Sequence, residues 1–76
     1  MSVITVIKEY LLDSTPSFTQ IQLAKMANVA PETFSTYMNN KAKFPKSKIA
    51  LLLWKLKDSV SAEKHQELEA LFKPYI

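Results

Sequence analysis

The sequence contains no glycine among its 76 residues, although it contains four prolines. Two-residue β-hairpin turns prefer pairs such as Asn-Gly or Gly-Gly, and the phosphate-binding loops of Walker and Rossmann proteins require glycine. Asparagine is the residue that next best tolerates a left-handed backbone, and the chain has one Asn-Asn pair, Asn39-Asn40. These features predict an all-α fold whose helices are joined by short polar turns.

Length and the missing residue types narrow the class further. A chain of 76 residues supports one small domain, residues 1–76, and folding buries only about 60% of the unfolded surface, so the core is thin. Without cysteine, a zinc site would depend on His65, a lone imidazole expected on a polar helix face. No apolar run approaches the about 20 residues of a membrane span, and the N-terminus lacks the pattern of a signal peptide. We therefore expect a cytoplasmic protein with no membrane partner, metal, cofactor or small-molecule ligand.

Apolar residues recur at helical spacing in five segments, which predicts five helices. The first helix is expected to end before Pro16, and the second to begin with a capping box formed by Ser17 and Gln20. Pro31 suits the first position of the third helix, and Ile21 is expected among the buried residues of the second. The first, second and fourth predicted helices cover about residues 2–12, 18–27 and 47–56. The third runs from Pro31 to about Asn39, and the fifth runs from Ser61 until Pro74 stops it.

Basic charge is concentrated in the middle of the chain. Between Thr19 and Lys57 there are seven lysines and one acidic residue, Glu32, whereas the segment from Asp58 onward is acidic. The chain has no arginine, so every strongly basic side chain is a lysine. This asymmetry, more than the modest net charge of +3, indicates a polyanionic partner.

The second and third predicted helices are separated by Asn28-Val29-Ala30, the length of a helix-turn-helix connector. Ala24 supplies the small residue needed where the two helices cross, and Asn28 supplies a left-handed turn. The apolar supports of such a crossing are present at Leu23, Ala27, Val29, Phe34 and Tyr37. The segment TQIQLAKMANVAPETFSTYMNNKAKFP, residues 19–45, resembles the helix-turn-helix family of phage Cro proteins and repressors, in particular the all-helical Cro type.

The resemblance implies a five-helix Cro/repressor-like domain with its helix-turn-helix at about residues 18–40. It implies a regulator that reads a pseudo-palindromic operator through the major groove of double-stranded DNA. The residues implied as base readers are Pro31, Glu32, Ser35 and Thr36. The residues implied as phosphate contacts are Gln20, Asn39, Asn40, Lys41, Lys43 and Lys46.

Two of the implied base readers depart from the donors usual in the family. Pro31 can make only apolar contacts, for example with a thymine methyl group. Glu32 can accept a hydrogen bond from a cytosine amino group but repels phosphate, or it serves only to complement the helix dipole. Sequence reading would then depend partly on DNA shape.

The C-terminal region is rich in apolar residues for so short a chain. Those expected at a homodimer interface are Trp54, Leu68, Leu71, Phe72 and Tyr75. The leading hypothesis is therefore a homodimeric DNA-binding repressor. Two alternatives stay open: a helix-turn-helix module that binds another regulator as an antirepressor or co-regulator, and a non-specific nucleoid-binding protein. No nucleophile–base pair or paired carboxylates occur, so no enzymatic activity is expected.

Overall fold

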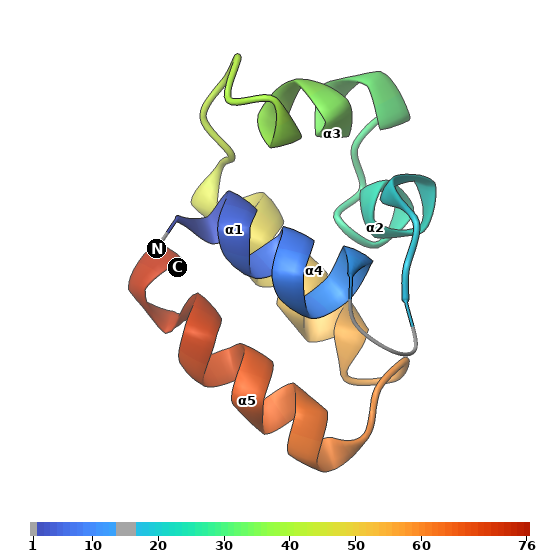
Figure 1. Cartoon of the computed structure of the whole chain (residues 1–76), viewed down its shortest axis with the longest axis vertical. Coiled ribbons are helices and arrows are strands. Elements are labelled where there is room, and N and C mark those ends of the chain that lie inside the picture. The colour runs from blue at the N-terminus through green and yellow to red at the C-terminus, as the bar shows by residue number, and fades with distance from the viewer. Residues whose placement is uncertain (1, 14–16) are drawn as a thin grey trace.

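The computed structural model describes residues 2–13 and 17–76, which form α-helices and no strand (Figure 1). The helices are α1 (Val3–Ile7), α2 (Gln20–Met26), α3 (Pro31–Met38), α4 (Lys46–Leu56) and α5 (Ala62–Phe72). A π-helical segment, η1 (Lys8–Leu12), extends α1, and a 3-10 turn, η2 (Lys73–Tyr75), follows α5. The prediction of an all-α fold is confirmed over these residues.

The first predicted helix is continuous but changes its winding. The hydroxyl of Ser2 accepts a hydrogen bond from the amide of Thr5 at 3.2 Å and so caps α1. From Lys8 onward the turns widen, and the amide of Asp13 bonds the carbonyl of Lys8 at 2.9 Å. The expected stop at Pro16 lies outside the described residues.

The start of the second helix differs from the prediction. Thr19, not Ser17, is the N-cap: its hydroxyl accepts from the Gln22 amide at 3.1 Å, and the Gln22 side chain accepts from the Thr19 amide at 2.9 Å. Both pairs have the spacing of a capping box, so the sequence motif alone does not choose between them. Phe18 decides the register, because its amide is bonded to the Leu11 carbonyl at 2.9 Å and its ring packs on the core.

The structure also corrects the expected burial of Ile21. The buried face of α2 and the turn after it consists of Leu23, Ala24 and Ala27. Ile21 lies to the side of that face and is 56% exposed, so the expectation that it is buried is wrong.

Helix α4 is the centre of the domain. It lies behind α1 in Figure 1 and packs against α2 and α5, while α1 packs against α5. Its buried residues are Ile49, Leu52, Leu53 and Leu56. The core that they help to form contains no buried polar or charged residue among the residues described.

His65 occupies a different environment from the polar face expected for it. Its side chain is 19% exposed, and its Nε2 lies 3.0 Å from the carbonyl oxygen of Leu53 in the last turn of α4. The last carbonyls of a helix lack intrahelical partners, and the Nε2–H tautomer of the imidazole donates to this one. His65 therefore joins α5 to the end of α4.

Two of the five residues expected at a dimer interface belong to the core instead. Leu68 and Phe72 are 0% exposed because they lie four residues apart on the inner face of α5. A side chain with no accessible surface cannot contact a second subunit, so this part of the expectation is wrong. Leu71 and Tyr75 are half-buried, and Trp54 is 56% exposed.

Candidate nucleic-acid interface

The turn between α2 and α3 is built around Asn28. Its backbone has φ 57°, the left-handed conformation expected from the sequence. The amide of Asn28 bonds the Lys25 carbonyl at 3.1 Å, and the amide of Val29 bonds the Ala24 carbonyl at 3.0 Å. This pair of bonds is a Schellman motif, which ends α2 and turns the chain into α3.

Lys48 strengthens the same turn from α4. Its ammonium group lies 3.3 Å from the carbonyl oxygen of Asn28 and donates to it. The connection joins residues 20 positions apart in the chain. It fixes the turn between α2 and α3 on the central helix.

Helix α3 begins and ends as the sequence predicts. Pro31 is its first residue, and Asn40, with φ 58°, follows its C-cap. The amide of Asn40 bonds the Tyr37 carbonyl at 3.1 Å, and the amide of Lys41 bonds the Thr36 carbonyl at 3.0 Å. This is a second Schellman motif, so asparagine serves at both helix ends where glycine is the more common residue.

The segment after α3, residues 41–46, consists of a loop and Lys46, the first residue of α4; we call it the lysine loop, and Phe44 anchors it. The Phe44 ring is 5% exposed and stands edge-on to Phe34, with the ring centroids 5.6 Å apart. It also stacks on Tyr37 at 4.7 Å with an interplanar angle of 23°. Because Phe34 and Tyr37 belong to α3, these contacts hold the loop against that helix.

The three lysines of this loop extend from the anchored backbone into solvent. Lys41, Lys43 and Lys46 are all exposed. Asn39 and Asn40, also exposed, follow the last residue of α3, and the three lysines come after them. The structure therefore places five of the six expected phosphate-contact residues in one continuous segment beside α3.

Gln20, the sixth expected phosphate contact, is the first residue of α2 and is exposed. The capping box of α2 uses Gln22, so the side chain of Gln20 is not committed to the cap. Helix α2 packs directly against α3. Gln20 is therefore positioned by the helix that supports α3, separately from the lysine loop.

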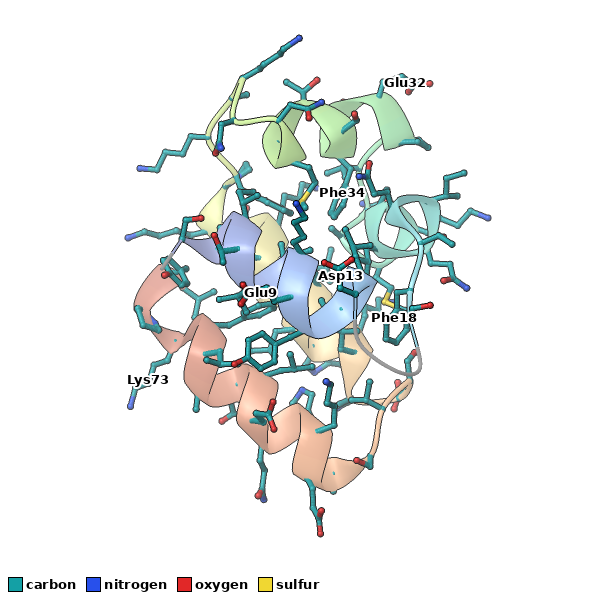
Figure 2. All side chains as sticks on the ribbon, in the orientation of Figure 1. Glu9, Asp13, Phe18, Glu32, Phe34 and Lys73 are labelled. Carbon is teal, nitrogen blue, oxygen red and sulfur yellow. The ribbon has the colours of Figure 1, made fainter. Side chains whose placement is uncertain are left out.

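The outward face of α3 carries the four expected base readers with different degrees of exposure. Pro31 and Glu32 are exposed, whereas Ser35 and Thr36 are half-buried. The Thr36 hydroxyl donates to the Glu32 carbonyl at 2.9 Å, which leaves its oxygen lone pairs as acceptors. Figure 2 shows Glu32 at the outer side of α3 and Phe34 directed toward the core.

Asn39 extends this polar face by one turn. Its side-chain amide lies 3.4 Å from the hydroxyl oxygen of Ser35, four residues earlier. The two side chains thus line up along α3. Ser35, Thr36 and Asn39 present hydroxyl and amide groups, the types that hydrogen-bond to base edges and phosphates.

Two further residues, one on this surface and one beneath it, are absent from the expected set. Thr33 is exposed in the first turn of α3, beside Glu32. It could have been found from the helical period, because Phe34, Tyr37 and Met38 define the inner face and Thr33 falls outside it. Phe44 was detectable only as an apolar residue between lysines, which does not reveal that it stacks on α3.

Charge is distributed unequally between the two ends of the molecule. The segment from α3 to the start of α4 contains four lysines, Lys41, Lys43, Lys46 and Lys48, and one carboxylate, Glu32. Helix α5, at the opposite end in Figure 1, carries three glutamates. A polyanion would therefore meet the α3 end in the favourable orientation.

Across residues 2–13 and 17–76, no three His, Cys, Asp or Glu side chains are grouped as metal ligands would be. Within those ranges, every helix is also too short or too polar to cross a lipid bilayer.

Comparison with known proteins adds no family assignment. The chain matches no protein-family model, no curated protein and no solved structure.

Proposed function

We propose that this protein is a DNA-binding regulator of transcription that inserts α3 into the major groove. The observation that carries the proposal is the pairing of α3, at the edge of the molecule, with the lysine loop that Phe44 fixes beside it. An α-helix with side chains is about 10–12 Å wide, and the major groove is about 12 Å wide. The dimensions and the charge of this end both suit duplex DNA.

Affinity and selectivity would come from different residues. Lys41, Lys43 and Lys46 would neutralise phosphates, which adds affinity without sequence information. Ser35 and Thr36 would contact base edges, together with the first turn that carries Glu32. Residues 19–45 of this chain resemble the phage Cro type, and repression would follow if the protein occupied promoter DNA.

A homodimer would give two copies of α3 separated by about one turn of DNA, as a pseudo-palindromic operator requires. The buried positions of Leu68 and Phe72 confine a dimer interface to other residues. Trp54 is the strongest remaining candidate, since its ring is exposed on α4 and the ammonium groups of Lys55 and Lys57 lie over it. The Lys57 ammonium lies 4.6 Å from the ring centroid, so this face is both apolar and cationic.

Selection from random-sequence duplexes, followed by gel-shift titration, tests the proposal. We expect enrichment of a two-fold symmetric site. Thr36→Ala should flatten the preference between enriched and scrambled sites, whereas Lys43→Ala should weaken both by a similar factor. If the two variants changed binding to every sequence equally, the assigned division between base and phosphate contacts would be wrong.

A second candidate function is supported by the exposed Glu32 and Trp54. A carboxylate at the tip of α3 opposes approach to phosphate, and an exposed tryptophan is typical of protein–protein contacts. On this hypothesis the domain binds another regulator. Absence of duplex binding even at low salt would favour it over the DNA-binding proposal.

A further inference from the structure

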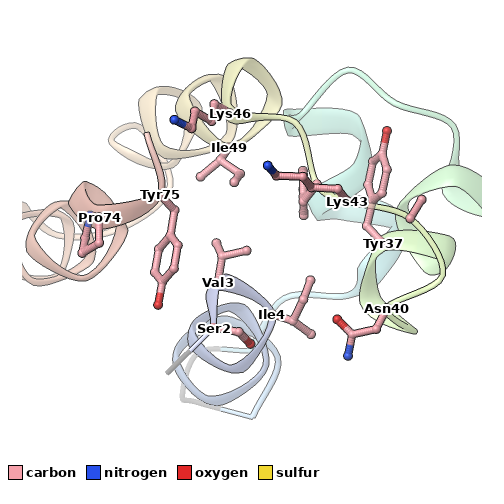
Figure 3. A pocket seen from close by; sticks show the side chains of 12 residues that line it. Ser2, Val3, Ile4, Tyr37, Asn40, Lys43, Lys46, Ile49, Pro74 and Tyr75 are labelled. Carbon is pink, nitrogen blue, oxygen red and sulfur yellow. The ribbon is translucent and has the colours of Figure 1, made fainter.

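A pocket of about 300 Å³ lies beside the lysine loop. It is formed where the start of α1, the end of α3 with its loop, the start of α4 and the η2 turn come together. Figure 3 shows Val3 and Ile4 on one side and Ile49 on the other, with Tyr37 and Tyr75 at the two ends. The volume is at the small end of the range for ligand pockets, about 300–1,000 Å³.

The pocket combines an apolar interior with a cationic edge. Lys43 and Lys46 line it on the Ile49 side (Figure 3), and none of the residues that line it is acidic. Both lysines are exposed, so their ammonium groups stay hydrated while their methylene stems border the cavity. An occupant that matches both parts has an apolar body and one negative charge.

We infer that this pocket binds a small amphipathic anion, such as a medium-chain carboxylate. The chain lies between Val3, Ile49 and Tyr75, and the carboxylate pairs with Lys43 and Lys46. This site is separate from the outward face of α3, and its binding reaction requires no DNA.

The consequence for regulation rests on the function proposed above. Lys43 and Lys46 are also expected phosphate contacts, and a bound carboxylate neutralises the same charges. Ligand and duplex therefore compete, and the ligand releases the protein from DNA.

Octanoate is a suitable probe, with 1-octanol as its uncharged analogue and inorganic phosphate as an anion without a chain. Backbone amide NMR titrations of the full chain without DNA report both affinity and location. We expect octanoate to shift resonances of residues that line the pocket, and to bind at least about fivefold more tightly than either control.

Two variants separate the charge from the cavity. Lys43→Gln/Lys46→Gln should weaken octanoate binding about fivefold, whereas Lys55→Gln/Lys57→Gln, with the same loss of charge, should leave it unchanged. Val3→Phe keeps both lysines and fills the apolar interior, so it should weaken octanoate binding while duplex binding persists. Far-UV circular dichroism confirms that each variant is folded.

The outcomes distinguish this inference from the function on which its consequence rests. Octanoate binding without any duplex binding supports the pocket and contradicts the DNA proposal. Duplex binding without saturable octanoate binding overturns the pocket. Shifts centred on Trp54, or equal affinities for octanoate and 1-octanol, overturn it as well.

Discussion

Helices α3 and α5 form opposite ends of the same molecule (Figure 1). Both pack an apolar inner face on the core, but their outer surfaces differ. Each buries one phenylalanine completely, Phe34 in α3 and Phe72 in α5. Outside, α3 carries one carboxylate and leads into an anchored loop with three lysines, whereas α5 carries three glutamates. Packing in the core thus requires apolar residues on both inner faces. The charge of the outer faces is not constrained by the core and can differ with the binding partner of each end.

The largest expected effect tests whether the inner faces are equivalent. Phe34→Ala and Phe72→Ala should each lower the free energy of unfolding by about 3–5 kcal/mol, because each leaves a cavity in a thin core. Phe34→Ala should cost about 0.5–1.5 kcal/mol more, since it also removes the edge-on contact with Phe44. Urea denaturation at 25 °C measures both losses. A larger loss for Phe72→Ala would show that the contact between Phe34 and Phe44 adds nothing to the free energy of unfolding.

The next prediction tests whether the outer faces differ in function. Replacing Lys41, Lys43 and Lys46 together with glutamine should reduce the slope of log affinity for DNA against log salt by about three per subunit, roughly 0.9 for each lost phosphate contact. Affinity for DNA at low salt should also fall, because fewer phosphates are neutralised. The midpoint of urea unfolding should stay nearly constant, because these lysines are exposed. Gel-shift titrations over a series of salt concentrations give the slope.

The matched control removes the same charge from another part of the surface. Lys8→Gln/Lys64→Gln/Lys73→Gln leaves the lysine loop and the Trp54 face intact, and we expect it to preserve most of the slope. Equal slopes for the two triple variants would mean that net charge alone, and not the position of the loop, determines duplex binding.

The features that could be predicted from the sequence are those with a local cause. Pro31 begins α3 because its missing amide is not needed there. The turns after α2 and α3 require a left-handed residue, and Asn28 and Asn40 occupy these positions in a chain that has no glycine. Helical spacing correctly placed Phe34 in the core. Local signals were therefore sufficient to position α3 and the turns at its two ends.

The remaining features depend on contacts between distant residues. Thr19 replaced Ser17 as the cap of α2 because Phe18 is bonded to Leu11, a contact that no local motif contains. His65 reaches a carbonyl of α4, and Phe44 stacks on α3. The same spacing that marks Leu68 and Phe72 as an apolar stripe fits a core face and an interface equally, so only the packing of α5 decides.

Backbone substitutions at the two asparagines test how firmly α3 is held at each end. Asn28→Ala and Asn40→Ala should each lower the free energy of unfolding by about 1–2 kcal/mol, since alanine is strained in the left-handed region. Asn28→Gly and Asn40→Gly should restore most of that loss. Urea denaturation of the four variants measures the difference, and equal stability of the alanine and glycine forms would contradict a conformational cause.

The smallest expected effect concerns Glu32, the feature of α3 that least resembles a DNA-binding surface. Glu32→Gln keeps the size of the side chain and removes the only acidic group between Thr19 and Lys57. If Glu32 merely opposes phosphate, affinity should rise about two- to fivefold for every duplex. If its carboxylate accepts from a cytosine amino group, the selected operator should lose affinity while scrambled duplexes gain it. Gel-shift titration of both duplexes separates these cases, and an unchanged affinity for both would place Glu32 away from the DNA and favour a protein partner at this end.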